Sequence, residues 1–325
     1  MPDRRSGLTP GTVLRASGGS YEVLLDDQTL IQATLRGRLK AATSGRGASG
    51  RRVRETIART GDRVVAGDRV RIAVLPDGSY TIEFVDDRRT ELARRAPGRN
   101  QHRAKVLVAN VDQIAIVFAV TRPDPHLRML DRFLVLAEAN HLDALIVANK
   151  CDLATKSEVE ALFAAYPAAG YTVLYTSVLS GEGVDALRDA LCHNESVLTG
   201  PSGVGKSSLL NAIEPGLELS VGDVSIAVGK GRHTTVTAAL IPLACGGFVA
   251  DTPGLREVGL WDIDRDELDG YFPEFRPLLG TCRFGSSCTH AHEPDCAIRD
   301  AVENHTINRH RFESYIALLG DDRMR

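Results

Sequence analysis

The first 90 residues alternate apolar and polar positions in short runs, which is the pattern of half-buried β-strands. Glycine pairs, aspartates and a Pro-Asp-Gly turn separate the runs, and no helical spacing intervenes. The runs lie at residues 12–17, 20–25, 30–35, 68–75 and 79–85. Five short strands without a helix predict an all-β barrel of the OB-fold type, which we place in residues 1–90.

Two basic segments accompany these strands. Residues 36–54 hold seven Lys or Arg and no Asp or Glu, with Gly, Ser and Ala between them. That composition favours an exposed loop over a packed element. Residues 88–105 form a second basic stretch, which Pro97-Gly98 interrupts, and we expect a linker there.

After residue 105 the pattern changes to buried strands that alternate with segments of helical apolar spacing. Strands are expected at 111–120, 144–150, 172–177, 196–200 and 247–250, and helices at 126–140, 157–166, 183–191 and 206–213. This alternation predicts an α/β domain with a mostly parallel sheet, which we place in residues 91–262. Residues 263–325 combine clustered cysteines with a helical tail, so we expect a third, mostly helical domain there.

Composition and charge refine this picture. Hydrophobic residues make up 43% and charged residues 25% of the chain, which is ordinary for a soluble protein. No membrane span or signal-peptide core is evident, so we expect a cytoplasmic protein with no membrane partner. Residues 1–105 carry 21 Lys/Arg and 12 Asp/Glu, a net charge of +9, whereas the remainder is net −12. A basic front end indicates a polyanionic partner, the alternative being a well-solvated surface.

The strongest motif is the segment 200–207, which reads G-x-x-x-x-G-K-S between a strand and a helix. Its glycines let backbone N–H groups surround phosphate oxygens, and the helix N-terminus favours negative charge. Lys206 is expected to reach the β- and γ-phosphates, and Ser207 to ligate Mg²⁺. The nucleotide-binding residues expected here are Gly200, Pro201, Ser202, Gly203, Val204, Gly205, Lys206, Ser207 and Ser208.

Two shorter motifs indicate a guanine nucleotide. In the D-x-x-G segment 251–254, we expect Asp251 to hold Mg²⁺ and the Gly254 N–H to bond the γ-phosphate. In the N-K-x-D segment 149–152, the Asp152 carboxylate can accept hydrogen bonds from N1–H and N2–H₂ of guanine, a pair that adenine lacks. Alone, either motif is commonly a turn, but both share a domain with a phosphate loop. The cofactor-binding set therefore also includes Asn149, Lys150, Asp152, Ser177 (at the O6 edge of guanine) and Asp251.

The order of these motifs is unusual. The N-K-x-D segment and Ser177 precede the phosphate loop, and the D-x-x-G segment comes last. Such an order predicts a circularly permuted G domain, because the same sheet forms when the usual ends are joined and the chain is opened elsewhere. The D-x-x-G segment then leads straight into residues 263–325, so a movement there is expected to shift the C-terminal domain.

A cluster of soft ligands lies near the C-terminus, at Cys282, Cys288, His290 and Cys296. Three thiolates and one imidazole suit one structural Zn²⁺, and disulfides are less suitable in a cytosolic chain. On the residues alone, His292 is a rival for the fourth position. The remaining cysteines, which we expect to be small core or surface residues, are Cys151, Cys192 and Cys245.

Together, the segments NKCDL, GPSGVGKSSLLNAI, GKGRHTT, ADTPGLRE, FPEF and CRFGSSCTHAHEPDCAIRDAV resemble the RsgA (YjeQ/YloQ) family of circularly permuted GTPases over nearly the whole chain. The resemblance implies GTP hydrolysis that the small (30S) ribosomal subunit stimulates, and a role in late maturation of that subunit through 16S rRNA. It also implies an OB-fold, a zinc domain and a ligand at His290 rather than His292. The family commonly has four residues between the first two cysteines, and this chain has five.

The resemblance further implies that residues 229–235 are switch I. Either Thr234 or Thr235 would complete the Mg²⁺ shell, and we favour Thr235. Leu255 stands where Ras-like enzymes place a water-orienting Gln, so intrinsic hydrolysis is expected to be slow. The resemblance implies His233 as a candidate for activating water, the alternative being a solvated loop histidine. The expected catalytic residues are Lys206, His233, Thr234, Thr235 and Gly254.

Two other functions remain open at this point. A P-loop ATPase or kinase is argued against by the N-K-x-D motif. A nucleotide-switched RNA-binding module with little turnover of its own is the second alternative. We expect GTP and GDP as ligands and a monomeric protein.

Overall fold

The computed structural model describes residues 7–36, 64–95, 104–217, 219, 238–251 and 265–321. The chain forms two compact units. One comprises residues 1–112, 191–197 and 223–257, and the other comprises residues 113–190, 198–222 and 258–325. Within the described ranges, no helix has the length and apolar character needed to cross a membrane.

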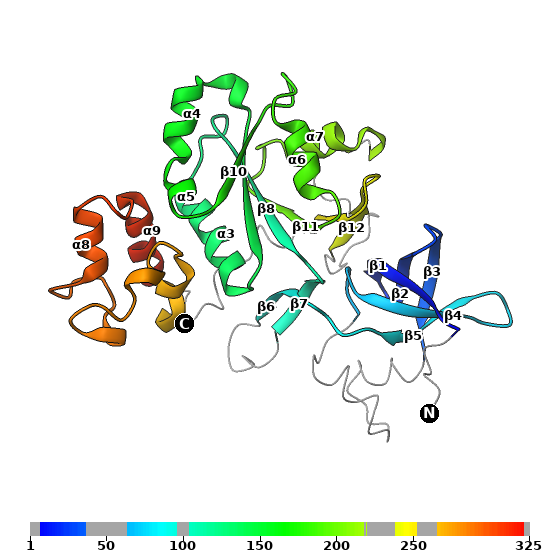
Figure 1. The fold of residues 1–325 in the computed structure, drawn as a ribbon. Helices are drawn as coiled ribbons and strands as arrows, with labels where there is room; N and C mark the ends of the chain where they lie inside the picture. Colours follow the sequence, from blue (N-terminus) through cyan, green and yellow to red (C-terminus); the bar gives the residue numbers. More distant parts are fainter. Residues whose placement is uncertain are drawn as a thin grey trace. The chain divides into compact units, whose positions relative to one another are not determined.

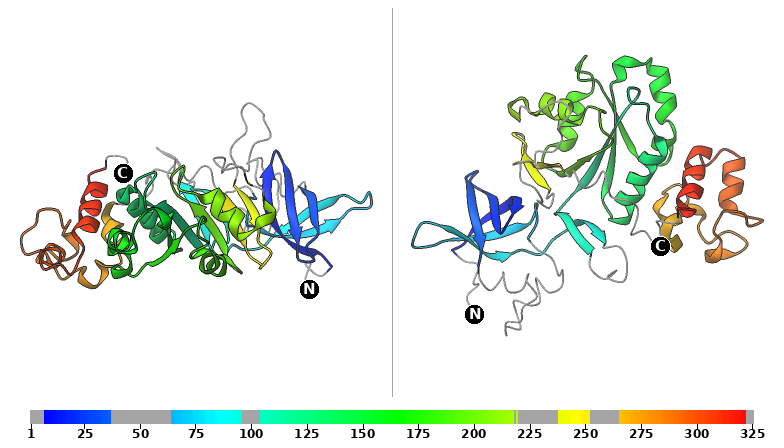
Figure 2. Two further views of the ribbon diagram at one scale, coloured as in Figure 1. Left: turned by 90° about the horizontal axis from the view of Figure 1, so that it is seen from above. Right: turned by 180° about the vertical axis from the view of Figure 1, so that it is seen from behind.

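The first unit begins with a closed five-stranded barrel (Figure 1). Its strands are β1 (Thr9–Ser17), β2 (Ser20–Leu25), β3 (Leu30–Leu35), β4 (Arg69–Val74) and β5 (Tyr80–Val85). The strand order is β1-β2-β3-β5-β4, and β4 pairs with β1 to close the barrel. Figure 2 shows the same strands curving round on themselves. Alternate side chains such as Val13, Val23 and Ile82 point inward and are fully buried, so the predicted OB-fold barrel is confirmed.

The expected linker at 88–105 is wrong, because the chain there contains strands. Strand β6 (Glu91–Arg95) pairs antiparallel with β7 (Ala104–Ala109), and Pro97-Gly98 falls between them, outside the described residues. Leu92, Val106 and Val108 are buried at alternate positions within this basic stretch. The alternation of apolar residues therefore indicates the local structure better than the basic charge does. The Pro-Gly pair lies between two paired strands in the sequence rather than between two domains.

A second hairpin in this unit consists of β12 (Ala239–Pro242) and β13 (Phe248–Asp251). Strand β12 also pairs with β1, at Ala239 and Arg15. A disulfide joins Cys245, in the turn of this hairpin, to Cys192. The prediction that these two cysteines are ordinary core or surface residues is therefore wrong.

The second unit contains the predicted parallel sheet. Strands β8 (Gln113–Ala119), β9 (Asp143–Asn149) and β10 (Thr172–Thr176) are parallel in the order β10-β9-β8. Strand β11 (Glu195–Thr199) follows β8 in the strand order, and its first three residues belong to the first unit. Helices α3 (Leu127–Ala139), α4 (Lys156–Phe163) and α5 (Ala165–Ala168) connect β8, β9 and β10 in turn. The connection from β10 to β11 contains helix α6 (Val184–Leu191) and crosses the sheet in the reverse direction to the earlier connections. Because such crossovers are right-handed, α6 lies on the face opposite to α3, α4 and α5 (Figure 1).

The sheet's fully buried strands read as continuous apolar runs, as parallel strands covered on both faces do. Helix α7 (Lys206–Ile213) follows β11 after the phosphate loop. The α/β prediction is thus confirmed, with the loops that carry the candidate site at the carboxyl ends of β9, β10 and β11.

The C-terminal part of this unit is mostly helical, as predicted. It contains α8 (Ala297–Glu303), α9 (Arg309–Leu319) and the 3₁₀ helices η4 (Arg265–Tyr271), η5 (Arg276–Leu278) and η6 (Gly285–Ser287). Phe272, Phe275 and Tyr315 form an aromatic centre with ring centroids 5.1 to 5.5 Å apart. The three predicted cysteine ligands belong to this same core, and the ring of His290 lies 6.2 Å from that of Tyr315.

Candidate functional site

The phosphate loop joins β11 to α7 in a conformation that only glycine readily adopts at two positions. Gly200 has φ = 135° and Gly205 has φ = 100°. A Cβ atom at Gly200 would lie 2.1 Å from the Val117 carbonyl oxygen, and one at Gly205 would lie 2.4 Å from Asn149 Nδ2. The missing side chains thus let the loop pass directly against β8 and the end of β9.

Two side chains at the start of α7 face this loop. Lys206 is 4% exposed, and its ammonium donates to the carbonyl oxygens of Gly200 at 2.8 Å and Pro201 at 2.6 Å. The Ser207 hydroxyl is buried and has no hydrogen-bond partner among the described residues. Because buried hydroxyls are normally satisfied, an unpartnered one at a phosphate loop fits a metal or phosphate ligand.

The N-K-x-D segment is tied to the phosphate loop by two side chains. Asn149 is 2% exposed and donates from Nδ2 to the Val204 carbonyl at 2.8 Å. The Lys150 ammonium donates to the Gly203 carbonyl at 2.7 Å and also to the Arg122 carbonyl. The two bonds to the phosphate loop bring residues 55 and 53 positions apart in sequence to one edge of the sheet.

Asp152 lies beside the buried Ser177. The Ser177 hydroxyl donates to Asp152 Oδ1 at 2.5 Å and accepts from the Ser180 N–H at 3.2 Å. The turn that results places Val178 and Leu179 at its exposed tip, with Leu179 85% exposed. Ser177 therefore orients the carboxylate that we expect to recognise a base.

Several predicted site residues cannot be placed in this way. The backbone of Asp251 ends β13, but His233, Thr234, Thr235 and Gly254 lie outside the described residues. Their roles stay predictions. Conversely, no motif in the sequence points to Arg122, because Arg122 contributes its backbone carbonyl to Lys150 and a backbone contact does not depend on residue type.

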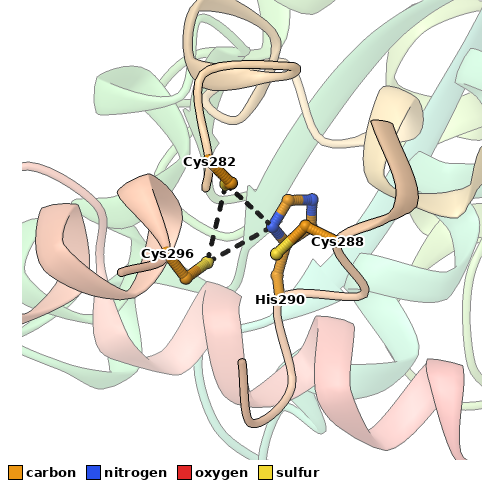
Figure 3. A group of neighbouring side chains, drawn as sticks. All are labelled: Cys282, Cys288, His290 and Cys296. Atoms are coloured by element: carbon orange, nitrogen blue, oxygen red, sulfur yellow. Dashed lines mark hydrogen bonds between the residues drawn. The ribbon is translucent and has the colours of Figure 1, made fainter. Parts of the chain in front are cut away.

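The predicted metal ligands converge in the C-terminal part (Figure 3). The ligand atoms of Cys282, Cys288, His290 and Cys296 all lie within 4.8 Å of one another. His290 Nδ1 lies 3.3 Å from Cys296 Sγ and 3.6 Å from Cys282 Sγ, and all four side chains are buried. Such a donor set could hold a metal ion such as zinc.

The surroundings of His290 fit this role. Its Nε2 lies 3.3 Å from Asp269 Oδ2, so a carboxylate orients the ring with Nδ1 toward the sulfurs. Burial opposes protonation of His290, yet Asp269 and the neighbouring sulfurs raise its pKa to about 9, so a metal ion has to displace a proton from the ring when it binds. The rival His292 is exposed and outside the cluster. The five residues between Cys282 and Cys288 include the short helix η6.

A phosphate loop after β11 and an N-K-x-D segment after β9, which precedes it in the chain, define a P-loop GTPase domain of permuted order. The family model described as RsgA GTPase matches residues 85–261. The chain therefore belongs to the RsgA GTPase family and is a GTP-hydrolysing enzyme.

Curated relatives and solved structures agree with this assignment. A protein of Gemmatimonas aurantiaca named small ribosomal subunit biogenesis GTPase RsgA is 50% identical over 312 residues, which cover 95% of this chain and 96% of the relative. A Moorella thermoacetica protein of the same name is 43% identical, with 96% of each chain covered.

Two solved structures share the fold. The crystal structure of YjeQ from Thermotoga maritima superposes with a TM-score of 0.75 at 33% identity, covering 96% of this chain and 97% of the other. The structure of YloQ, described as a circularly permuted GTPase, gives a TM-score of 0.70 at 28% identity, covering 98% and 96%. The permuted order of motifs is thus shared with a solved relative.

Proposed function

We propose that this chain hydrolyses GTP to GDP and phosphate in the late maturation of the small ribosomal subunit, which stimulates the reaction. The observation that carries the nucleotide assignment is the contact of the N-K-x-D segment with the phosphate loop, through Asn149 and Lys150. The ribosomal assignment rests on the relatives, whose name is small ribosomal subunit biogenesis GTPase.

In this proposal the base and the phosphates occupy neighbouring sites. Asp152, oriented by Ser177, accepts the two N–H groups on the Watson–Crick edge of guanine. The backbone N–H groups of residues 203–208 surround the phosphates, and Lys206 exchanges its loop carbonyls for β- and γ-phosphate oxygens. The adenine of ATP would leave the carboxylate unpaired.

Mg²⁺ would be held by Ser207, Asp251 and Thr235, and when bound it neutralises charge on the β- and γ-phosphates. The buried, unpartnered hydroxyl of Ser207 supports this ligand set. Around the γ-phosphate, we assign the Gly254 N–H to binding and His233 to positioning water, and Thr234 is the alternative to Thr235 as the magnesium ligand. Leu255 cannot orient water, so unstimulated turnover is expected to be slow.

Zn²⁺ would be held by Cys282, Cys288, His290 and Cys296, where it supplies a cross-link for a small core.

The barrel and residues 36–54 would bind 16S rRNA, because their basic side chains can neutralise phosphates. Most of that segment lies outside the described residues. The protein would act in the cytoplasm as a monomer.

Paired binding and turnover measurements test the nucleotide assignment. The full chain is titrated with fluorescent GDP, and unlabelled GTP, ATP and XTP serve as competitors. We expect GTP to compete at least about 100-fold better than ATP, since adenine lacks the paired donors that the carboxylate needs. Lys206→Ala is expected to abolish hydrolysis. Equal competition by ATP would contradict the guanine assignment. Nucleotide binding without any turnover, with or without subunits, would favour the alternative of an RNA-binding switch. Leu255 is compatible with that alternative, because it cannot orient water.

A further inference from the structure

The disulfide between Cys192 and Cys245 lies outside both sites described above. Cys192 directly follows α6, and Cys245 lies in the turn between β12 and β13. Their Cα atoms are 5.5 Å apart, although 53 residues separate them in sequence. Both residues are half-buried, so neither is sealed in the core.

Backbone contacts hold the two cysteines together independently of the sulfur–sulfur bond. The His193 N–H donates to the Gly246 carbonyl at 2.8 Å, and the Phe248 N–H donates to the Asn194 carbonyl at 2.9 Å. A Cβ atom at Gly247 would lie 2.6 Å from the Asn194 carbonyl oxygen, so the two segments touch closely. The same contacts would keep the two thiols near each other after reduction, which favours re-formation of the bond.

The other four cysteines are placed differently. Three belong to the metal cluster, and Cys151 donates its thiol to the Ala148 carbonyl at 3.1 Å. The chain has six cysteines, all of them described, and one disulfide is formed among them. Oxidation at Cys192 and Cys245 is therefore separable from metal binding.

The cross-link joins the starts of two neighbouring strands. Cys192 lies three residues before β11, which leads to Gly200, and Cys245 lies three residues before β13, which ends at Asp251. Strands β11 and β13 are adjacent in the sheet. Oxidation therefore restrains the amino ends of the strands that lead into the phosphate loop and the D-x-x-G segment.

We propose that Cys192 and Cys245 are a site of reversible oxidation, at which thiol–disulfide exchange with a low-molecular-weight disulfide stiffens this strand pair. The thiolate of one cysteine attacks a sulfur of oxidised glutathione, which forms a mixed disulfide and releases one glutathione thiolate. The other cysteine then attacks the protein sulfur and releases the second glutathione. Two protein thiols are oxidised, one glutathione disulfide is reduced to two thiols, and excess glutathione reverses the exchange.

The zinc-loaded full chain is equilibrated in glutathione buffers of increasing oxidised fraction, then acid-quenched, alkylated, digested and analysed by mass spectrometry. We expect the peptide that links Cys192 to Cys245 to rise and fall reversibly with the buffer. The oxidised form is expected to melt at least about 4 °C higher, because the cross-link closes a long loop of the unfolded chain. Amide exchange of residues 192–195 and 243–248 is expected to be faster in the reduced form.

Variants make the assignment specific. Cys192→Ser, Cys245→Ser and the double variant are each expected to melt at the same temperature in the most reducing and the most oxidising buffer. Cys151→Ser is expected to keep the shift in melting temperature that the native chain shows between these two buffers. If both cysteines are alkylated as free thiols in every buffer, the proposal is wrong. It is equally wrong if the cross-link resists excess glutathione in the folded protein, since the bond is then permanent.

Discussion

The guanidinium of Arg311 in α9 donates from Nη1 to Oδ1 of Asp131 in α3 at 2.6 Å, and neither side chain has exposed surface. Arg311 also bonds both carboxylate oxygens of Glu274, at 2.7 and 3.2 Å, and lies over the Phe272 ring at 4.6 Å. The C-terminal helices are therefore fastened to α3 by a buried ion-pair network. A movement of those helices that begins at the D-x-x-G segment must either break this network or carry α3 with it.

Removing Arg311 is expected to be strongly destabilising. Arg311→Ala should lower the free energy of unfolding by about 3–5 kcal/mol, because it removes the cation that the buried Asp131 and the partly buried Glu274 share. The double variant Asp131→Leu/Arg311→Met should recover part of that loss. Arg283→Ala is a matched control, since Arg283 and Asp295 pair on the exposed surface and should contribute below about 1 kcal/mol. Urea unfolding of the four proteins decides this, and similar losses for Arg311→Ala and Arg283→Ala would contradict it.

Changing Asp152 is expected to alter base preference without changing the fold. Asp152→Asn should weaken GDP binding about 100-fold, since the charge is lost and one of the two acceptor oxygens is replaced by an N–H₂ donor that faces a donor of guanine. It should bind XDP more tightly than the native chain does, because an amide N–H₂ can donate to the xanthine oxygen. Competition titrations measure both affinities, with Asp185→Asn on exposed α6 as the control. Unchanged preference among GDP, XDP and ADP would show that Asp152 does not contact the base.

The Asp269 carboxylate is expected to position His290 for metal binding. Asp269→Ala should weaken zinc affinity about 10–100-fold, the usual effect of losing a carboxylate that orients a ligating histidine. Cys288→Ala removes a ligand and should lose the metal under the same conditions. The control is Glu267→Ala, which changes an exposed carboxylate in the same 3₁₀ helix η4. Competition with a chromophoric chelator gives the affinities; equal affinity for Asp269→Ala and Glu267→Ala would refute the role.

Glu195 is expected to make stability depend on pH. Burial, together with the nearby Asp112 carboxylate, raises the pKa of Glu195 from 4.5 to about 8. Its Oε2 is buried and has no hydrogen-bond partner in the described part of the chain. Between about pH 4.5 and 8 the folded chain thus holds a proton on Glu195 that the unfolded chain releases. The contribution of protonated Glu195 to the free energy of unfolding is therefore present at low pH and is lost as pH rises.

Glu195→Gln should remove that dependence. The variant is expected to gain stability relative to the native chain as pH rises from about 5.5 to 8.5, since the neutral amide cannot ionise. Denaturation midpoints at several pH values measure the difference between the two proteins. A difference that is constant across this range would mean that Glu195 titrates normally.

The sequence predicted those parts of the molecule in which local pattern and burial agree. Strands β8 and β9 are continuous apolar runs. The phosphate loop has a spacing of Gly, Lys and Ser residues that is rare in other loops. The metal ligands were found because three cysteines and a histidine fall within 15 residues. In each case the signal lies within a short segment.

What the sequence did not predict depends on contacts between distant segments. Arg311 and Asp131 are 180 positions apart, and Cys192 and Cys245 are 53 apart, so neither pair has a local signature. The hairpin of β6 and β7 was missed for a different reason. Its buried Leu92, Val106 and Val108 are interspersed with positive charges, and the Pro97-Gly98 pair in the sequence is typical of a linker.

The most direct test of the proposed function is GTP turnover by the full chain with purified small ribosomal subunits, and with large subunits as the control. We predict that small subunits raise kcat at least about tenfold, because the chain lacks the usual water-orienting residue and depends on its partner. Large subunits should leave the rate unchanged, and Lys206→Ala should be inactive in both mixtures. Turnover that small subunits do not raise, or that both subunits raise equally, would contradict the account.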